Sequence, residues 1–175
     1  MLDKVKEFVT ESFGKEHPHL ERTLYWVKEL KPDASEELLI AARSHDIERA
    51  FNPEVKDMKE YRTGAGQEKH EVEGGRIMFD FLIKEGYDPE KAERVQELIS
   101  RHEVGGDAEQ NLLMDADSLS WLEVSAPKHI AKRTFSKEEL EKKVAFMYDR
   151  ISSKEAKDIA GKFYEEAIGM LEKID

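Results

Sequence analysis

Residues 38–47 of the chain read Leu38-Leu39-Ile40-Ala41-Ala42-Arg43-Ser44-His45-Asp46-Ile47. The apolar run at the start predicts a helix that is buried over most of its surface. His45 and Asp46 at the end are polar, and burying both without partners would be costly. An imidazole and a carboxylate together suit a transition-metal ion such as Mn, Fe, Zn or Ni. Because neighbouring helical residues point about 100° apart, we expect the helix to end here and let both side chains converge.

Apolar residues recur at three- and four-residue steps through most of the chain, which is the spacing of amphipathic helices. Helix-start signals accompany them at Pro18, at Ser35, at Asp88-Pro89 and in a capping box of Ser136 with Glu139. No stretch alternates with a period of two, and no Asn-Gly hairpin turn is present. We therefore expect an all-α fold of about eight helices. The later helices are expected over residues 68–85, 88–102, 110–123, 136–151 and 154–173.

The segment 51–67 predicts a long loop between two of these helices. Asn52-Pro53 and Gly64-Ala65-Gly66 are its breakers, and the glycine pair predicts a flexible turn. The charged piece 54–61 would form a short surface helix at most. A loop of this length in a compact domain is usually functional or mobile.

Composition limits the class of protein. A chain of 175 residues with 39% apolar and 38% charged residues predicts one soluble domain, residues 1–175. The absence of cysteine rules out disulfides and thiolate sites, and with no signal peptide or membrane span we expect a cytoplasmic protein. The formal net charge of −11 argues against unspecific binding to nucleic acid or anionic membranes.

Histidines and aspartates follow the opening stretch in a recurring order: His19, His45-Asp46, His70, His102 and Asp117, the last in Ala116-Asp117-Ser118-Leu119. This order, from about residue 17 to residue 122, resembles the HD-domain superfamily of metal-dependent phosphohydrolases. The resemblance implies an HD-type helical bundle with an HD core at about 17–123. A C-terminal helical extension would then cover about 128–175.

The resemblance also implies a metal site. His19, His45, Asp46 and Asp117 would hold one ion and leave positions open for water and substrate. Asp115 competes with Asp117 for this role, but it lies two positions off the same helix face. Two further residues, His70 and His102, resemble ligands of a second ion bridged by Asp46. Two alternatives remain for this pair: contact with substrate phosphate across a single ion, or no role beyond a helix surface.

The reaction expected from such a site is hydrolysis of a phosphate ester by metal-activated water. The metal, Mn, Fe, Ni or Zn as one or two ions, would acidify the water and neutralise developing charge. Glu48 is the candidate general base, although related nucleotidases place an essential acid further along, where this chain has Arg49. Arg49 and Arg101 are the candidate phosphate contacts because they lie beside Asp46 and His102.

The substrate is expected to be a small phosphorylated metabolite or a nucleotide. Aromatic residues could stack a base, although such residues more often belong to the core: Tyr25, Trp26, Phe51, Tyr61 and Trp121. One alternative function is a nucleotide-binding regulatory module with little turnover. Another is an HD scaffold used for protein contacts, which would not need the histidines. The last helices predict either intramolecular packing or a homodimer surface.

Overall fold

A computed structural model describes residues 1–52 and 64–174, with side chains described from His70 onward in the second range. Every regular element in these ranges is helical, so the all-α prediction is confirmed. In chain order the elements are α1 (Leu2–Phe13), α2 (Pro18–Leu30), α3 (Glu36–Ser44), α4 (Glu48–Phe51), α6 (Gly64–Lys84), α7 (Pro89–Ile99), α8 (Ala108–Ser120), the π-helical turn η1 (Trp121–Ser125), α9 (Ala126–Lys132), α10 (Lys137–Asp149) and α11 (Lys154–Leu171).

The helix starts predicted from capping residues are confirmed. The Ser35 hydroxyl accepts a hydrogen bond from a backbone amide in the first turn of α3. The Asp88 carboxylate does the same for α7, with Pro89 as its first residue. Ser136 and Glu139 form the reciprocal capping box of α10. Local sequence determines these starts because each side chain satisfies amides within its own turn.

The predicted loop over 51–67 is wrong at its C-terminal end, because α6 already begins at Gly64. Each glycine costs a helix about 1 kcal/mol, but the long contact of α6 with α7 outweighs that cost. The glycines predicted as a flexible turn therefore lie inside the start of α6. The short helix considered for residues 54–61 lies outside the described residues.

A second difference concerns the helix predicted over 110–123. It begins and ends earlier, as α8, and passes through η1 into α9, which the sequence analysis did not predict. The amide of Ala126 bonds to the carbonyl of Trp121, five residues back. Pro127 then lies in the first turn of α9, where its missing amide hydrogen is not needed. The proline that suggests a break therefore begins a new helix.

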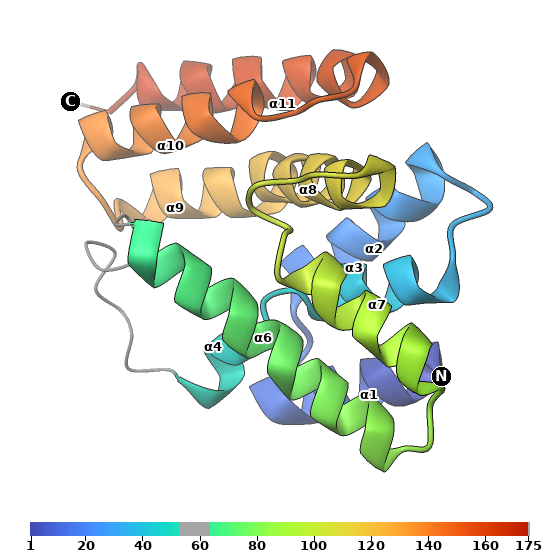
Figure 1. The fold of residues 1–175 in the computed structure, drawn as a ribbon. Helices are drawn as coiled ribbons and strands as arrows, with labels where there is room; N and C mark the ends of the chain where they lie inside the picture. Colours follow the sequence, from blue (N-terminus) through green and yellow to red (C-terminus); the bar gives the residue numbers. More distant parts are fainter. Residues whose placement is uncertain (53–63, 175) are drawn as a thin grey trace.

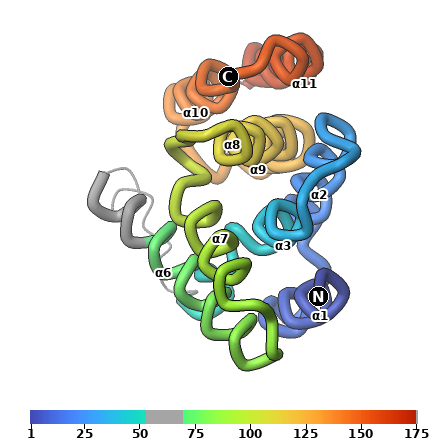
Figure 2. The backbone as a smooth tube through the Cα atoms, turned by 45° about the vertical axis from the view of Figure 1, so that its right-hand side comes forward, coloured from blue at the N-terminus to red at the C-terminus, as the bar shows by residue number. Residues whose placement is uncertain are grey.

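The helices form layers in which α8 is central. In Figure 1, α10 and α11 lie side by side above α8 and α9. Figure 2, viewed from another side, places α2, α3 and α7 beneath α8, with α6 packed on α7 and α1 next to α3. The predicted metal ligands come from α2, the end of α3, α6, the end of α7 and α8. They therefore meet on the inner side of α8, away from the lower helix α1.

The helix predicted to be the most buried, α3, lies in the interior of the protein. Four apolar residues of α3 have no exposed surface: Leu38, Ile40, Ala41 and Ala42. Burial of this stripe on α2, α7 and α8 contributes about 25 cal/mol for each Å² of apolar surface removed from water. Within the described part of the chain, no helix has the length and apolar character needed to cross a membrane.

Gly75 sets how closely α6 approaches α7. A Cβ atom built on Gly75 would lie 2.6 Å from Ser100 Oγ and 2.8 Å from the carbonyl oxygen of Gln96. Gly75→Ala is therefore expected to lower the free energy of unfolding by about 1–3 kcal/mol. Gly161→Ala is the matched control, because a Cβ there meets no atom within 4 Å and should stabilise α11 by about 0.5–1 kcal/mol. Urea denaturation followed by circular dichroism measures both, and equal shifts would contradict the close packing.

Candidate metal centre

His45 and Asp46 lie in a tight turn between two helices, as the sequence analysis expected. α3 ends at Ser44 and α4 begins at Glu48. Between them, the amide of Ile47 bonds to the carbonyl of Ser44 at 2.9 Å, which is a three-residue step. Such tight turning lets adjacent side chains project into one space. Both side chains are buried.

His19 and Asp117 face His45 from α2 and α8. His19 Nε2 lies 2.9 Å from Asp117 Oδ1, and His45 Nε2 lies 3.3 Å from the same oxygen. The two Nε2 atoms are 3.3 Å apart. Ligand atoms of these three residues lie within 4.8 Å of one another and could hold a metal ion. Asp46 Oδ2 is also close, 3.9 Å from His19 Nε2.

His70 and His102 approach from the other side of Asp46. His70 Nε2 lies 3.1 Å from Asp46 Oδ1, and the ring centre of His102 is 4.9 Å from that of His45. His45, Asp46 and His102 form a second group of ligand atoms within 4.8 Å. The structure thus brings together all six histidines and aspartates predicted as ligands, although they are scattered over nearly a hundred positions.

The imidazoles of His19 and His45 have their outward nitrogens fixed by hydrogen bonds. Ser120 Oγ donates to the His19 carbonyl at 2.7 Å and lies 2.9 Å from His19 Nδ1, from which it accepts. His45 Nδ1 donates to the carbonyl oxygen of Ala42 at 3.2 Å. Because Nδ1 is the donor in both rings, Nε2 is the nitrogen that faces Asp117 and can carry either a proton or a metal ion. Such partners orient metal-binding histidines.

His70 and His102 follow the same rule. His70 Nδ1 lies 2.7 Å from Glu48 Oε2, and the other Glu48 oxygen accepts a hydrogen bond from Asn52. His102 Nδ1 donates to the carbonyl oxygen of Ile99 at 2.7 Å. Four imidazole nitrogens and two carboxylates are thus presented to one small volume. This donor set fits a divalent transition metal.

The two aspartates remain ionised inside the protein. Burial would raise the pKa of Asp46, but the charge of Arg49 and a hydrogen bond from His70 hold it well below its usual range. Burial would likewise raise the pKa of Asp117, and Arg150 with the hydrogen bond from His19 outweighs it. Both carboxylates are therefore available as anionic ligands at neutral pH.

The histidines differ in their preference for a proton. Burial alone would lower the pKa of His45, but its hydrogen bond with Asp117 and the charge of Asp46 raise it. Burial and the charge of His45 lower the pKa of His102 to about 4. The centre thus favours positive charge between its carboxylates and keeps His102 neutral. A divalent cation would supply that charge and displace protons.

The model of a domain of unknown function, DUF4202, matches residues 3–169. The chain belongs to the DUF4202 family. Comparison with curated proteins gives no significant match.

The fold of this DUF4202 member is similar to a crystal structure described as a predicted HD superfamily hydrolase from an uncultured Thermotogales bacterium. The TM-score is 0.67 at 16% sequence identity, covering 98% of this chain and 89% of the other. The HD fold expected from the order of histidines and aspartates is therefore confirmed. The likeness concerns the fold, and the neighbour itself is described only as a predicted hydrolase.

Arg150 is a residue that the sequence analysis missed. It ends α10, and its buried guanidinium bonds to Asp117 Oδ2, to a carboxylate oxygen of Glu103 and, at 2.7 Å, to Ser118 Oγ. Asp117 therefore turns Oδ2 to Arg150 and Oδ1 to the imidazoles. The C-terminal part of the DUF4202 chain thus contributes a cation directly behind the predicted ligands.

The choice between Asp115 and Asp117 follows from the same contacts. Asp115 faces away from the histidines and accepts hydrogen bonds from the amides of Ser152 and Ser153 at 2.7 and 2.9 Å. These bonds hold the start of α11 against α8. Asp115 is thus engaged at a helix end, while Asp117 faces the imidazoles.

Arg49 and Arg101, the two residues predicted to contact phosphate, differ in their distance from the ligand cluster. Arg49 Nε lies 3.1 Å from Asp46 Oδ1, and nearly half of its side chain, 48%, is exposed. Arg101 is also exposed, but its Nε donates to the carbonyl oxygen of Gly105. Among the described residues, no hydrogen bond or ion pair connects Arg101 with a predicted ligand. Arg49 therefore lies at the centre, whereas Arg101 supports a loop beside it.

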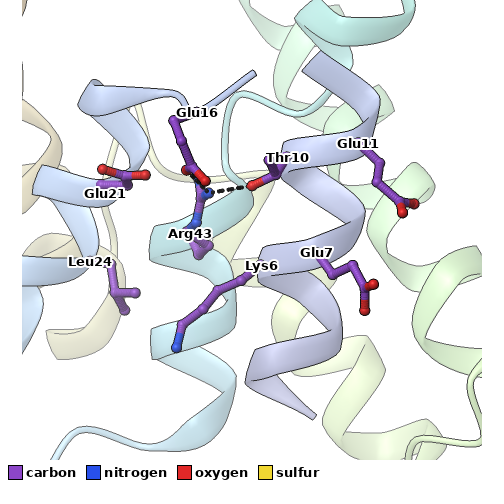
Figure 3. Close-up of a pocket in the computed structure, with 8 residues that line it drawn as sticks. All are labelled: Lys6, Glu7, Thr10, Glu11, Glu16, Glu21, Leu24 and Arg43. Atoms are coloured by element: carbon purple, nitrogen blue, oxygen red, sulfur yellow. Dashed lines mark hydrogen bonds and ion pairs between the residues drawn. The ribbon is translucent and has the colours of Figure 1, made fainter. Parts of the chain in front are cut away.

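A hollow of about 520 Å³ on another side of the molecule is not part of this centre. Figure 3 shows it between α1, α2 and α3, with Arg43 extending toward Glu16 and Thr10. Its remaining lining includes three more glutamates and Lys6, and none of the predicted ligands. An excess of carboxylates does not favour a phosphorylated substrate. The buried histidine and aspartate cluster remains the candidate site.

Proposed function

We propose that the chain is a metal-dependent phosphohydrolase acting on a small phosphorylated metabolite or a nucleotide. One observation carries the proposal: four buried imidazoles have Nδ1 hydrogen-bonded to oxygen, which leaves Nε2 of each as the ligand atom. A purely structural cluster would not need four similarly oriented histidines around two ionised carboxylates. The HD fold supports the proposal as an analogy.

We assign the ligands to two positions. Asp46 would serve both positions, because Oδ1 faces His70 while Oδ2 is the oxygen nearer to His19. A single imidazole nitrogen serves one ion, so His45 belongs to the first position only. The first position would use His19, His45, Asp46 and Asp117, and the second Asp46, His70 and His102. The donors suit Mn, Fe, Ni or Zn.

Divalent ions held by these residues would supply an acidified water and would neutralise charge on the phosphoryl oxygens. Glu48, the candidate base, is engaged with His70 and Asn52. We therefore assign Glu48 to orienting His70, in place of the proton-accepting role considered from the sequence. Arg49 is half-exposed beside Asp46 and is placed to attract an anion toward the centre.

The test begins with elemental analysis of the purified protein and continues with phosphate release. The protein is stripped with EDTA and reloaded separately with Mn²⁺, Fe²⁺, Ni²⁺ or Zn²⁺. Each form is assayed on p-nitrophenyl phosphate, nucleotides and sugar phosphates. We expect bound metal, hydrolysis that EDTA abolishes, and recovery with at least one ion.

Two results would overturn this function. Hydrolysis that persists in EDTA would mean that the metal is not needed. Tight nucleotide binding with bound metal and no phosphate release would favour the alternative, a regulatory module.

A further inference from the structure

Lys143 lies close to Arg150, because both cations approach the ring of Phe146, at 5.1 and 5.5 Å from its centre. The two residues are seven positions apart, so they project from the same face of the helix about 10 Å apart along its axis. That face packs toward α8 and η1. Arg150 contacts Asp117 near the end of α8, and Lys143 faces Trp121, the first residue of the following turn η1.

The ammonium of Lys143 lies against aromatic rings and not against a carboxylate. Nζ is 5.1 Å from the ring centre of Phe146 and 5.8 Å from that of Trp121. Among the described side chains, no carboxylate lies at ion-pair distance from this Nζ. Its neighbour Lys142, by contrast, is exposed and paired with Glu138. Lys143 is half-buried, and its ammonium makes cation–π contacts with both rings.

The charges that face Lys143 leave it without a dedicated counter-ion. Glu103 and Asp117 attract it, but both carboxylates are bonded to Arg150. Arg150 and Arg49 repel it. Burial, together with these two positive charges, lowers the pKa of the Lys143 ammonium. Lys143, Arg150 and Arg49 thus lie near one another beside the centre, where Glu103 and Asp117 balance part of their charge.

We propose that Lys143, together with Arg49, binds the phosphoryl group of the substrate, and that the substrate class is a phosphomonoester dianion. The inference rests on the proposed function, because it places the anion beside the same centre. A phosphomonoester carries about 1.5 to 2 negative charges at neutral pH, whereas a diester carries one for each phosphorus. Cations additional to the metal favour the more highly charged group.

The test compares Lys143→Met with Lys142→Met. Methionine keeps an unbranched apolar side chain against Trp121 and Phe146 but removes the charge, and the control removes the same charge one residue away. Isothermal titration with inorganic phosphate is performed on the Mn²⁺-loaded and the EDTA-treated protein. We expect Lys143→Met to weaken phosphate binding about ten- to hundredfold, and Lys142→Met to change it by less than about twofold.

Kinetics give the second measurement, with p-nitrophenyl phosphate and bis-p-nitrophenyl phosphate as monoester and diester. We expect the unmodified protein to prefer the monoester and Lys143→Met to lose most of that preference. Lys143→Arg should retain most phosphate binding, which separates loss of charge from misfolding. Unchanged phosphate binding in Lys143→Met, or a preference of the unmodified protein for the diester, would overturn the inference.

The two proposals fail in different ways. If hydrolysis is metal-dependent while Lys143→Met behaves like Lys142→Met, the phosphohydrolase stands and the role of Lys143 is wrong. If no hydrolysis is found but Lys143→Met alone loses phosphate binding, the anion site stands and the catalytic function is wrong.

Discussion

Asp46→Asn is expected to remove the bound metal and to reduce phosphate release by about a thousandfold or more. Asp46 is the carboxylate placed between the two sets of imidazoles, with Oδ1 at 3.1 Å from His70 Nε2. Asparagine has nearly the same shape as aspartate but no charge, so the substitution weakens the binding of every ion that the carboxylate would hold. Metal content by elemental analysis and initial rates at saturating substrate measure the two effects.

Asp115→Asn is the matched control for this substitution. Asp115 is equally buried, but it caps the start of α11 through the amides of Ser152 and Ser153. Its replacement should lower the free energy of unfolding by about 1 kcal/mol and leave the metal content unchanged. If Asp46→Asn kept its metal and its rate, or if Asp115→Asn lost both, the assignment of the centre would be wrong.

The fold could be predicted where the information is local. Ser35, Asp88 and Ser136 mark helix starts because their side chains bond to amides within the next turn. The passage from α8 through η1 to α9 could not be predicted in this way. Trp121 and Pro127 look like the end of a helix, but the chain continues as a π-helical turn that packs against α2, α10 and α11. The early start of α6 at Gly64 has a similar tertiary cause.

The clustering of His19, His45, Asp46, His70, His102 and Asp117 could be predicted because their order in the sequence resembles that of the HD-domain superfamily. The positions of Arg150 and Lys143 near this cluster could not be predicted, since a charged residue on an amphipathic helix is normally solvated. A signal was nevertheless present in α10. Leu140, Val144 and Met147 form its buried stripe, and positions 143 and 150 fall on that stripe. A cation that interrupts an apolar stripe is expected to have a buried partner or a ligand.

Arg150→Met is expected to lower the free energy of unfolding of the metal-free protein by about 3–5 kcal/mol. The guanidinium is buried between Asp117 and Glu103, and without it two carboxylates remain inside with no cation between them. For a chain of this length the midpoint of thermal unfolding should fall by about 10 °C. Added Mn²⁺ should raise the midpoint of the variant more than that of the unmodified protein, because the centre has gained one unit of negative charge.

Arg76→Met is the control, since Arg76 forms exposed ion pairs with Glu73 and Asp80, and such pairs contribute little to stability. The effect of Arg150 should also depend on pH. Its charge is the first contribution that holds the pKa of Asp117 low, and this stabilises the fold above the ordinary carboxyl pKa of about 3.9. That stabilisation is lost as the pH falls through the lowered pKa, so the difference between Arg150→Met and the unmodified protein should shrink in acid. A difference that stayed constant from pH 7 to pH 3 would mean that Arg150 acts by packing and not by its charge on Asp117.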